Sequence, residues 1–396
     1  QELITGSTTD ADGLYRIEAV PVGLYTLVIS YIGYRQAAIP EVIVNSGKEV
    51  VLEIVLEETA VEMEAVVVSA AEKGETANEM AMISARPFTV DETDRYAGSR
   101  GDPARMASNF AGVQGNDDSN NGIVVRGNSP YSMVWRVENV NVPGMNHFSA
   151  TGRSSGPVCI LNNKYLSNSL FYTGTFPAEY GNSIGSIFDL KMRNGNNEIH
   201  EFTGQFGLFG TELSVEGPIN KESRSSYLVN YRYGTVAIFQ ALGIELGTSA
   251  TPYYQDGAFK LNFPGKKNNN LSIFGIAGYS KIDLIQSTLT DTAETDIYQS
   301  TPTDEYFRTG KAGVGMNYSQ TLNENTYLRL TLAGSRDYSR NEIYNVYRHV
   351  SDVGKYVLDS MPYESDYEYI LDRISFNQYL NKKLSRKHKL RFGSDF

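Results

Sequence analysis

The stretch Pro177-Ala178-Glu179-Tyr180-Gly181, which continues through Gly185-Ser186-Ile187-Phe188-Asp189-Leu190 to Asn194-Gly195-Asn196, separates two parts of the chain with different sequence patterns. From Glu201 onward, apolar and polar residues alternate in runs of about eight to twelve residues that turn residues separate. A period of two places every second side chain on the same face of a strand. This part of the chain therefore predicts a series of antiparallel β-strands, each with one apolar and one polar face.

Six runs show the alternation most clearly: residues 202–208, 227–233, 259–263, 312–318, 328–332 and 374–380. Transmembrane β-strands have this period because one face meets lipid and the other meets a wet interior. The runs therefore favour an outer-membrane β-barrel. On this pattern and the composition alone, a soluble β-sandwich rich in tyrosine stays open as the alternative.

The connections between the runs alternate in length. Short polar turns are expected at 217–223, 264–270, 322–326 and 384–389, and long connections at 234–253, 283–305 and 339–366. Outer-membrane barrels have short periplasmic turns and longer outer loops. The alternation therefore favours the barrel over the sandwich, although the connection at 208–211 is short where the pattern asks for an outer loop.

The composition agrees with a barrel that faces lipid. The chain has 27 tyrosines and 17 phenylalanines but one tryptophan, which suits rings placed at both membrane interfaces. No apolar run reaches the roughly 18 residues of a transmembrane helix, and the first residues are not a signal peptide. The net charge of −11 argues against nucleic acid as a partner. The single cysteine, Cys159, is expected to be a small buried residue.

The stretch from Pro177 to Asn196 resembles the closing segment of the plug in TonB-dependent outer-membrane receptors, where the plug leads directly into the first barrel strand. Val125-Arg126-Gly127, followed by an expected strand from Met133 to Val142, is similar to the plug core of that family, in which an Arg-Gly pair precedes two strands. The run from Thr9 to Tyr15, together with Ser30-Tyr31-Ile32-Gly33-Tyr34, resembles the carboxypeptidase-regulatory-like domain that precedes many of these plugs.

The resemblance implies a mainly β fold with four regions. They are a small carboxypeptidase-regulatory-like (transthyretin-like) β-sandwich at 1–58, truncated at its start, with strands at 15–17, 25–31 and 50–56; a linker at 59–86; an α+β plug domain at 87–197, with a helix-compatible run at 102–110; and the first part of the barrel at 198–396. About nine strands can be counted after Glu201, whereas a transmembrane barrel with a plugged lumen has about 22. We therefore expect a fragment of a larger receptor.

The function that the resemblance implies is import of a solute across the outer membrane by energy-coupled rearrangement of the plug. The expected partners are the energy-transducing protein TonB, outer-membrane lipid and an unidentified solute, and the N-terminal domain would lie in the periplasm. A starch-utilisation-type subfamily usually carries Val-Gly-Tyr-Gly after its valine run. Ser69-Ala70-Ala71-Glu72 stand there in this chain, which leaves a surface lipoprotein lid open as a further partner.

Two segments are the candidate sites. Glu64, Ala65, Val66, Val67 and Val68 lie where the family has its TonB box, and a short β-branched segment suits strand addition to the edge of a partner's sheet. The alternative is that these valines complete the preceding domain. Candidate ligand-binding residues follow the plug strands in a loop of mixed polar and aromatic character: Asn146, His147, Phe148 and Arg153. For these residues, packing against the barrel wall is the alternative to ligand contact.

No enzymatic activity, cofactor or metal site is expected. Two Gly-x-Ser-x-Gly matches, at 152–156 and 181–185, lie in a loop and before a strand, not at the strand-to-helix turn of a hydrolase. The four histidines, at 147, 200, 349 and 388, lack metal-ligand spacing. The acidic run from Asp117 ends its possible calcium loop in Asn128, where an EF-hand needs glutamate.

Two other functions compete with transport. The first is a structural subunit of an outer-membrane secretion or assembly complex that uses the same fold without transport. The second is a surface-signalling receptor, whose N-terminal signalling domain would be a βαβ unit. The first 58 residues are predicted to be all-β, so signalling is the least favoured of the three functions.

Overall fold

The structure, a computed structural model, describes residues 4–10, 13–31, 34, 37–44, 50, 52, 54, 56, 85–88, 98–99, 101–167, 169–207, 210–234, 252–266, 268–290, 302–323, 325–385 and 388–396. It divides into two compact units, Gln1–Ala77 and Asn78–Phe396. The segment predicted to bind TonB, Glu64 to Val68, lies outside the described residues.

The first unit contains an antiparallel pair of strands, β1 (Gly23–Ile29) and β2 (Ala37–Val44), whose register shifts between Tyr25 and Leu27. The prediction of a strand at 25–31 is confirmed in its main part. Residues 15–17, predicted as a strand, have no strand pairing in the structure, whereas β2 was missed. Pro40 explains the omission, because a proline within an apolar run argues against a strand that is paired on both sides.

The second unit begins with the plug, whose main sheet has five strands in the order β3-β10-β11-β6-β7. These strands are β3 (Ala85–Phe88), β10 (Ser169–Tyr172), β11 (Ser186–Leu190), β6 (Met133–Val137) and β7 (Val140–Val142). β11 and β6 run parallel, with Phe188 opposite Trp135, and the other neighbours are antiparallel. The stretch from Pro177 to Asn196 thus supplies β11, a central strand of the plug.

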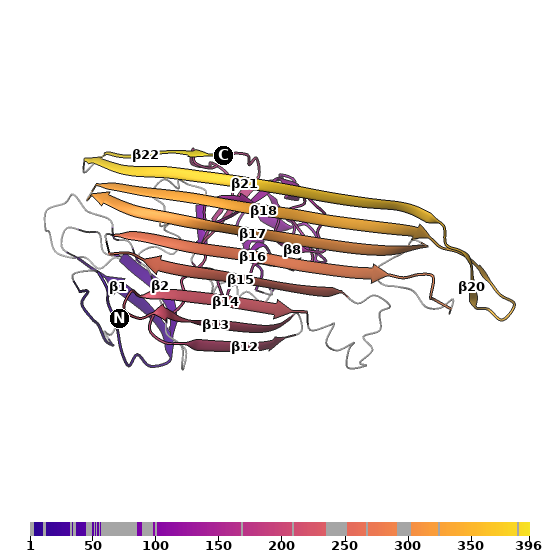
Figure 1. Cartoon of the computed structure of the whole chain (residues 1–396), viewed down its shortest axis with the longest axis horizontal. Helices are drawn as coiled ribbons and strands as arrows, with labels where there is room; N and C mark the ends of the chain where they lie inside the picture. The colour runs from indigo at the N-terminus through magenta and orange to yellow at the C-terminus, as the bar shows by residue number, and fades with distance from the viewer. Residues whose placement is uncertain are drawn as a thin grey trace. The chain divides into compact units, whose positions relative to one another are not determined.

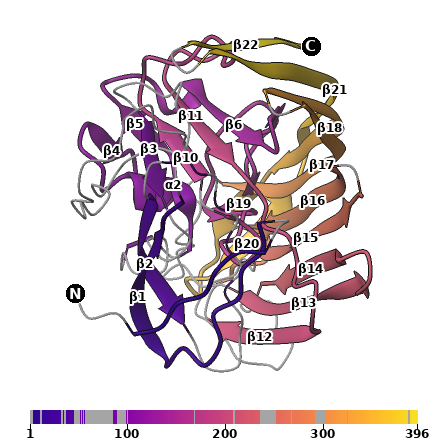
Figure 2. The same ribbon diagram turned by 90° about the vertical axis from the view of Figure 1, so that its left-hand side faces the viewer.

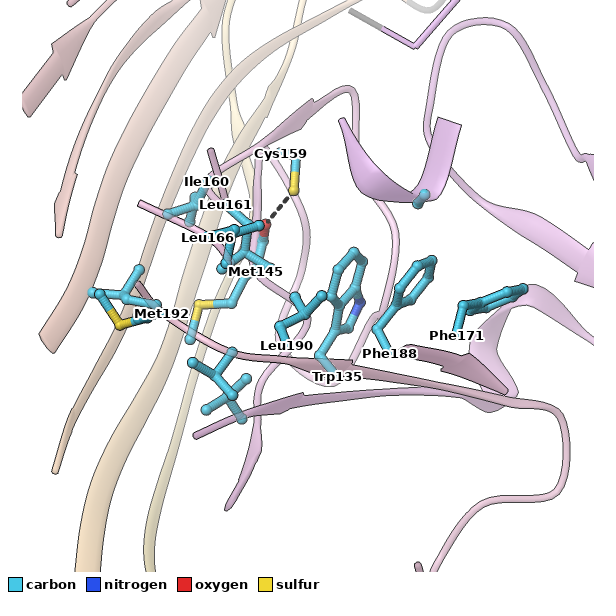
Figure 3. Close-up of a cluster of buried hydrophobic side chains, with 14 of the residues drawn as sticks. Trp135, Met145, Cys159, Ile160, Leu161, Leu166, Phe171, Phe188, Leu190 and Met192 are labelled. Carbon is cyan, nitrogen blue, oxygen red and sulfur yellow. Dashed lines mark hydrogen bonds between the residues drawn. The ribbon is translucent and has the colours of Figure 1, made fainter. Parts of the chain in front are cut away.

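Alternate residues of the central strands build the apolar core of the plug. Trp135 stacks on Phe188 with ring centroids 4.7 Å apart, and Phe188 lies 4.4 Å from Phe171 (Figure 3). Cys159 is buried in the same cluster and its thiol donates to the carbonyl oxygen of Met145 at 3.5 Å. The expectation of a small buried cysteine is confirmed.

Short elements complete the plug. They are α2 (Pro103–Ala107), the 3₁₀ helix η1 (Pro130–Ser132), and two small hairpins, β4 (Val113–Gly115) with β5 (Ile123–Val125) and β8 (Asn146–His147) with β9 (Val158–Cys159). The buried Asp102 side chain caps α2 by accepting from the amide of Ala104 at 2.8 Å. A proline directly after the cap suits the first helical position, which needs no amide donor.

In the part of the chain that the structure describes, nine antiparallel strands follow in sequence order and form one curved sheet, which we call the wall (Figures 1 and 2). They are β12 (Glu201–Gly207), β13 (Gly210–Asn220), β14 (Ser225–Tyr233), β15 (Tyr253–Pro264), β16 (Asn269–Leu284), β17 (Thr303–Asn323), β18 (Thr326–Asn345), β21 (Tyr363–Ser385) and β22 (His388–Asp395). The plug sheet lies on the concave side of the wall (Figure 2). The prediction of about nine barrel strands is confirmed.

The two faces of the wall have the predicted alternation. On the face away from the plug, Phe202, Leu213 and Ile374 are 78%, 61% and 82% exposed. The face toward the plug carries polar residues such as Lys260 and Asn317, which are buried. Several inward apolar residues also join the plug core: Leu228, Ala258, Phe274, Ile276 and Ala333. Plug and wall therefore share one hydrophobic core with charged groups around it.

The connections of the wall follow the predicted alternation of short and long. β17 and β18 are joined by two residues and β21 and β22 by two, whereas 17 residues separate β18 from β21. The longer connection contains a separate hairpin of β19 (Tyr347–Val350) and β20 (Tyr356–Ser360), which extends beyond the end of the wall in Figure 1. We call the end of the wall that carries the long connections its outer end.

Candidate functional site

The contacts between plug and wall form the candidate functional site, and the first lies at the turn between β6 and β7. Glu138 and Asn139 make this turn with φ values of 50° and 72°. Two-residue hairpin turns with two positive φ values favour Asn-Gly or Asp-Gly. A glutamate there costs about 1 to 3 kcal/mol of backbone strain. Its side-chain contacts must therefore offset that strain.

The Glu138 carboxylate is buried among donors from three wall strands and from the plug. Its Oε1 atom lies 3.1 Å from Lys260 Nζ of β15 and accepts from the amide of Met192 at 2.8 Å. Its Oε2 atom accepts from Arg329 Nη2 of β18 at 3.0 Å and from Asn317 Nδ2 of β17 at 2.7 Å. We call these five residues the Glu138 clamp.

The charge balance of the clamp keeps Glu138 ionised. Burial alone would raise the pKa of the Glu138 carboxyl, because it disfavours the charged form. The positive charges of Lys260, Arg329 and Lys191, together with the amide of Met192, outweigh burial and lower the pKa to about 2. The carboxylate is thus charged, fully bonded and shielded from water.

Three further ion pairs join plug and wall: Arg193 with Glu216 of β13, Arg136 with Asp395 of β22, and Glu179 with Arg391 of β22. Arg193 is bidentate, with its two terminal nitrogens 2.5 and 2.7 Å from the oxygens of Glu216. Paired planar groups of this kind make the stronger charged hydrogen bonds of proteins. Charged plug residues therefore meet charges of opposite sign on wall strands that lie far apart.

The second contact to β15 lies at His147 in β8. His147 Nε2 is 2.9 Å from Asp256 Oδ2, and the same oxygen accepts from Arg232 Nε of β14 at 2.9 Å and from its Nη2 at 2.7 Å. The imidazole packs on Tyr254, with ring centroids 4.9 Å apart. Burial lowers the pKa of His147, against the opposing effect of Asp256. We call His147, Asp256 and Arg232 the His147 latch.

The loop after β8 is tied to the outer part of the wall. The amide of Phe148 donates to Ser280 Oγ at 2.9 Å, the amide of Thr151 to Ser339 Oγ at 3.1 Å, and the amide of Gly152 to Asp337 Oδ2 at 2.9 Å. The hydroxyl of Thr151 also contacts Ser339 Oγ at 2.9 Å, so backbone amides and the Thr151 side chain together fix the loop. Side chains that stay exposed are free to meet a solute.

The four predicted ligand-binding residues fall into two groups. Asn146 and His147 are buried, and Asn146 donates to the carbonyl oxygen of Ser154 at 2.9 Å. Phe148 is half-buried, and Arg153 is exposed, with its guanidinium 5.6 Å from the ring centroid of the exposed Tyr131. The structure therefore leaves Phe148 partly and Arg153 fully accessible, and it adds Tyr131 beside Arg153.

Sequence reasoning missed the Glu138 clamp and the partners of His147. Met133 to Val142 was predicted as one strand, but it forms two strands and the turn at Glu138 and Asn139. A charged residue followed by asparagine in an otherwise apolar segment is a signal for such a turn. The wall partners Lys260, Arg329 and Asp256 carried no local signal beyond their polar positions in alternating strands.

The other motifs keep local roles. The hydroxyl of Ser154 donates to the carbonyl oxygen of Pro130 at 2.7 Å, and that of Ser183 to the carbonyl oxygen of Ser186 at 3.1 Å. Asp117 accepts from the amide of Ser119 at 2.7 Å, as in an ordinary polar turn. Within the described part of the chain, no group of three or more His, Cys, Asp or Glu residues could hold a metal ion.

Comparisons with known proteins bear on the class of protein. Residues 1–68 match the model of the CarboxypepD_reg-like domain. Among curated proteins, none matches the chain. In the described residues, no helix has the length and apolar character that crossing a membrane requires.

Several solved structures resemble the chain in fold. The closed form of the ferric-catecholate import receptor Fiu from E. coli K12 has a TM-score of 0.54 at 12% identity, covering 81% of this chain and 48% of that one. BauA, the ferric preacinetobactin receptor from Acinetobacter baumannii, has a TM-score of 0.51 at 10% identity, covering 80% and 46%. The siderophore receptor PirA from Acinetobacter baumannii has a TM-score of 0.50 at 15% identity, covering 79% and 47%.

The chain spans about half the length of these solved receptors. It has their fold in that part: a plug on the concave side of a run of barrel strands. The mainly β fold with a partial barrel, predicted from the sequence, is therefore confirmed. The resemblance to TonB-dependent receptors is confirmed at the level of the fold, and the N-terminal region matches the expected regulatory-like domain.

Proposed function

We propose that the protein is a TonB-dependent receptor of the outer membrane that imports a solute by rearranging its plug. The observation that carries this proposal is the shared interface of plug and wall. The plug contacts the wall through ion pairs and hydrogen bonds to β13, β15, β17, β18 and β22. The apolar side chains on the other face of the wall suit contact with lipid.

An interface that combines apolar contacts with ion pairs is compatible with a plug that must move. Charged groups that separate into water regain hydration, whereas separating a fully apolar interface exposes hydrocarbon. The segment from Glu64 to Val68 precedes the plug in the chain. A pull on it would transmit force to β3 and to the plug sheet that contains β3. Strand addition to TonB would supply the grip, because backbone hydrogen bonds need little side-chain specificity.

The coupling segment is tested by comparing Val67→Pro with Val67→Ala. Proline removes a backbone donor and should abolish uptake and TonB pull-down, whereas alanine keeps the backbone and should retain both. The match to the regulatory-like domain extends to residue 68, so limited proteolysis must show that this domain stays folded in both variants. Normal uptake in Val67→Pro would overturn the assignment.

The solute site is proposed at the plug surface that carries Phe148, Arg153 and Tyr131. An aromatic ring and a cation beside a fixed loop suit a polar solute with an anionic or aromatic group. Because the similar solved structures are named as a siderophore receptor, a ferric-catecholate import receptor and a ferric preacinetobactin receptor, ferric siderophores are the first ligands to assay. Phe148→Ala with Arg153→Ala should weaken binding at least tenfold, since a charged hydrogen bond contributes about 1.5 to 3 kcal/mol.

The same measurements separate transport from the competing functions. A scaffold of a secretion complex would support assembly of its partners in both Val67 variants. Solute binding would not depend on Phe148 or Arg153. A signalling receptor would change gene expression when its ligand binds. We infer transport because the plug is bonded to wall strands from β13 to β22, an arrangement that a scaffold does not need.

A further inference from the structure

We propose that the His147 latch is a proton-sensitive fastening that holds the β8–β9 hairpin of the plug to the wall at neutral pH and releases it in acid. The proposal rests on geometry around one imidazole. His147 is 1% exposed and Asp256 is 3% exposed, so neither group meets solvent while the hairpin is seated.

The tautomer of His147 follows from its partner. A carboxylate oxygen can only accept, so the contact of Nε2 with Asp256 Oδ2 requires the hydrogen on Nε2. In neutral histidine the other nitrogen, Nδ1, is then bare. Nδ1 has no hydrogen-bond partner among the described residues, and neither has Asp256 Oδ1. In the seated latch, neutral His147 therefore donates one hydrogen bond, from Nε2 to Asp256 Oδ2.

A proton added to Nδ1 would create a buried donor without an acceptor. Leaving a buried donor unsatisfied is costly, and more so when the group is charged. Asp256 would attract the imidazolium, but Arg232 already neutralises that carboxylate with two hydrogen bonds and repels a second cation. Protonation therefore opposes the seated position of the hairpin.

Among the residues that the structure describes, no other charged group facing His147 compensates for an added proton. Tyr254 of β15 contributes its ring, Cys159 of β9 is a buried thiol, and Tyr165, beyond β9, donates its hydroxyl hydrogen to the carbonyl oxygen of Ile160. On β16, Gly278 is so close that a Cβ placed there would lie 2.9 Å from His147 Cε1. The cross-strand partner of Gly278 is Lys311 of β17, which is paired with Asp337.

Release would expose His147 to water, where its ordinary pKa is about 6.5. Since the seated imidazole resists protonation, acid favours the released form. Between pH 7.5 and pH 5.5 the released fraction should rise about tenfold, which follows from the proton affinity of an exposed histidine. Neutral His147 therefore stabilises the seated hairpin above pH 6.5, and this stabilisation is lost as the pH falls below that value.

Cys159 provides a local reporter, because it lies opposite Asn146 in the β8–β9 pair and is 4% exposed. The intact protein in detergent is treated with a thiol reagent at pH 7.5 and 5.5. The modification rate of the peptide that carries Cys159 is measured by mass spectrometry and divided by the rate in denatured protein at the same pH. This ratio removes the direct effect of pH on the thiol.

The parent should show a rise of about tenfold in the normalised rate. His147→Gln keeps an amide donor for Asp256 but does not titrate, so its rate should not change with pH. His349→Gln, which removes the exposed histidine paired with Asp359 in the β19–β20 hairpin, should behave like the parent. If His147→Gln does not fold, His147→Phe preserves a ring that does not titrate and replaces it.

Three results would overturn the proposal. The first is a parent rate that changes less than twofold between the two pH values. The second is an acid response of the same size in the His147 variant as in the parent. Loss of the response in His349→Gln alone would assign it to the outer hairpin and would equally refute the latch.

Discussion

The Glu138 clamp and the His147 latch fasten the same plug to the same wall strand, β15, but they differ in how completely their charges are bonded. Both oxygens of Glu138 have partners, and positive charges surround it. At His147, one imidazole nitrogen and one carboxylate oxygen of Asp256 have no hydrogen-bond partner among the described residues.

The difference between the two places is the balance between burial and neighbouring charges. Burial disfavours the charged form of either side chain. At Glu138, three cations outweigh burial and the group stays charged. At His147, burial prevails over one shared carboxylate and favours the neutral form. The clamp is therefore suited to permanent attachment and the latch to attachment that conditions can change.

The largest effect is expected from Glu138→Ala. Removal of the carboxylate leaves the buried Lys260 and the partly buried Arg329 without this partner, and breaking a buried ion pair typically costs about 3 to 5 kcal/mol. Hydrogen exchange of the peptides from β6 and β7 should show this loss of stability. Glu222→Ala, at an exposed turn of the wall, is the matched control and should leave exchange unchanged. Unchanged exchange in Glu138→Ala would show that the clamp does not hold the plug.

A pH titration should separate the clamp from the latch. The Glu138 pKa falls from 4.5 to about 2 in the folded protein, and at 1.36 kcal/mol per pH unit this contributes about 3 kcal/mol. That stabilisation is fully present above pH 4.5 and is lost as the pH falls toward 2. Exchange at β6 and β7 should therefore be constant from pH 7.5 to 5, after correction for intrinsic rates. A loss of protection in that range would contradict the charge balance described for the clamp.

A smaller effect is expected from Gly278→Ala beneath the latch. The new Cβ would lie 2.6 Å from Ile160 Cδ1 and 2.9 Å from His147 Cε1, so the β8–β9 hairpin must shift. The nearest atom, Ile160 Cδ1, is the end of a flexible side chain. The free-energy cost of seating the hairpin should therefore be near 1 kcal/mol, at the lower end of the range for overpacking. Labelling of Cys159 should increase about fivefold. Gly334→Ala, whose Cβ meets no atom closer than 4.0 Å, is the control; equal labelling in both variants would exclude a tight fit at Gly278.

The smallest effect is expected from Arg336→Ala on the other face of the wall. Arg336 Nε lies 2.6 Å from Asp372 Oδ1, but the two side chains are 63% and 57% exposed. Ion pairs open to water contribute little. Melting of the barrel, followed by its gel mobility after heating, should not change. A clear fall in the melting temperature would show that charges on this face stabilise the wall as much as those on the inner face.

The sequence predicts the wall better than the interface. Alternation and turn residues are local signals, and they placed Phe202, Val314 and Ile374 on the outward face correctly. The clamp depends on residues 122 and 191 positions from Glu138 in the chain, Lys260 and Arg329. No local pattern encodes such pairings. The structure also separates the predicted ligand-binding residues of the β8 loop, because Asn146 is bonded to Asn121 and Ser154 inside the plug and His147 to Asp256 of the wall.

The length of β17 and β18 has a consequence for any solute that reaches the plug. The strands have 21 and 20 residues, about 65 to 70 Å at roughly 3.3 Å per residue, whereas a transmembrane strand needs about 9 to 11 residues. In the proposed outer-membrane barrel, about half of each strand extends beyond the hydrocarbon layer and forms part of a rim. A large particle, such as an antibody or a bacteriophage tail, would touch this rim first, while only a molecule small enough to pass between its sides could descend to the plug.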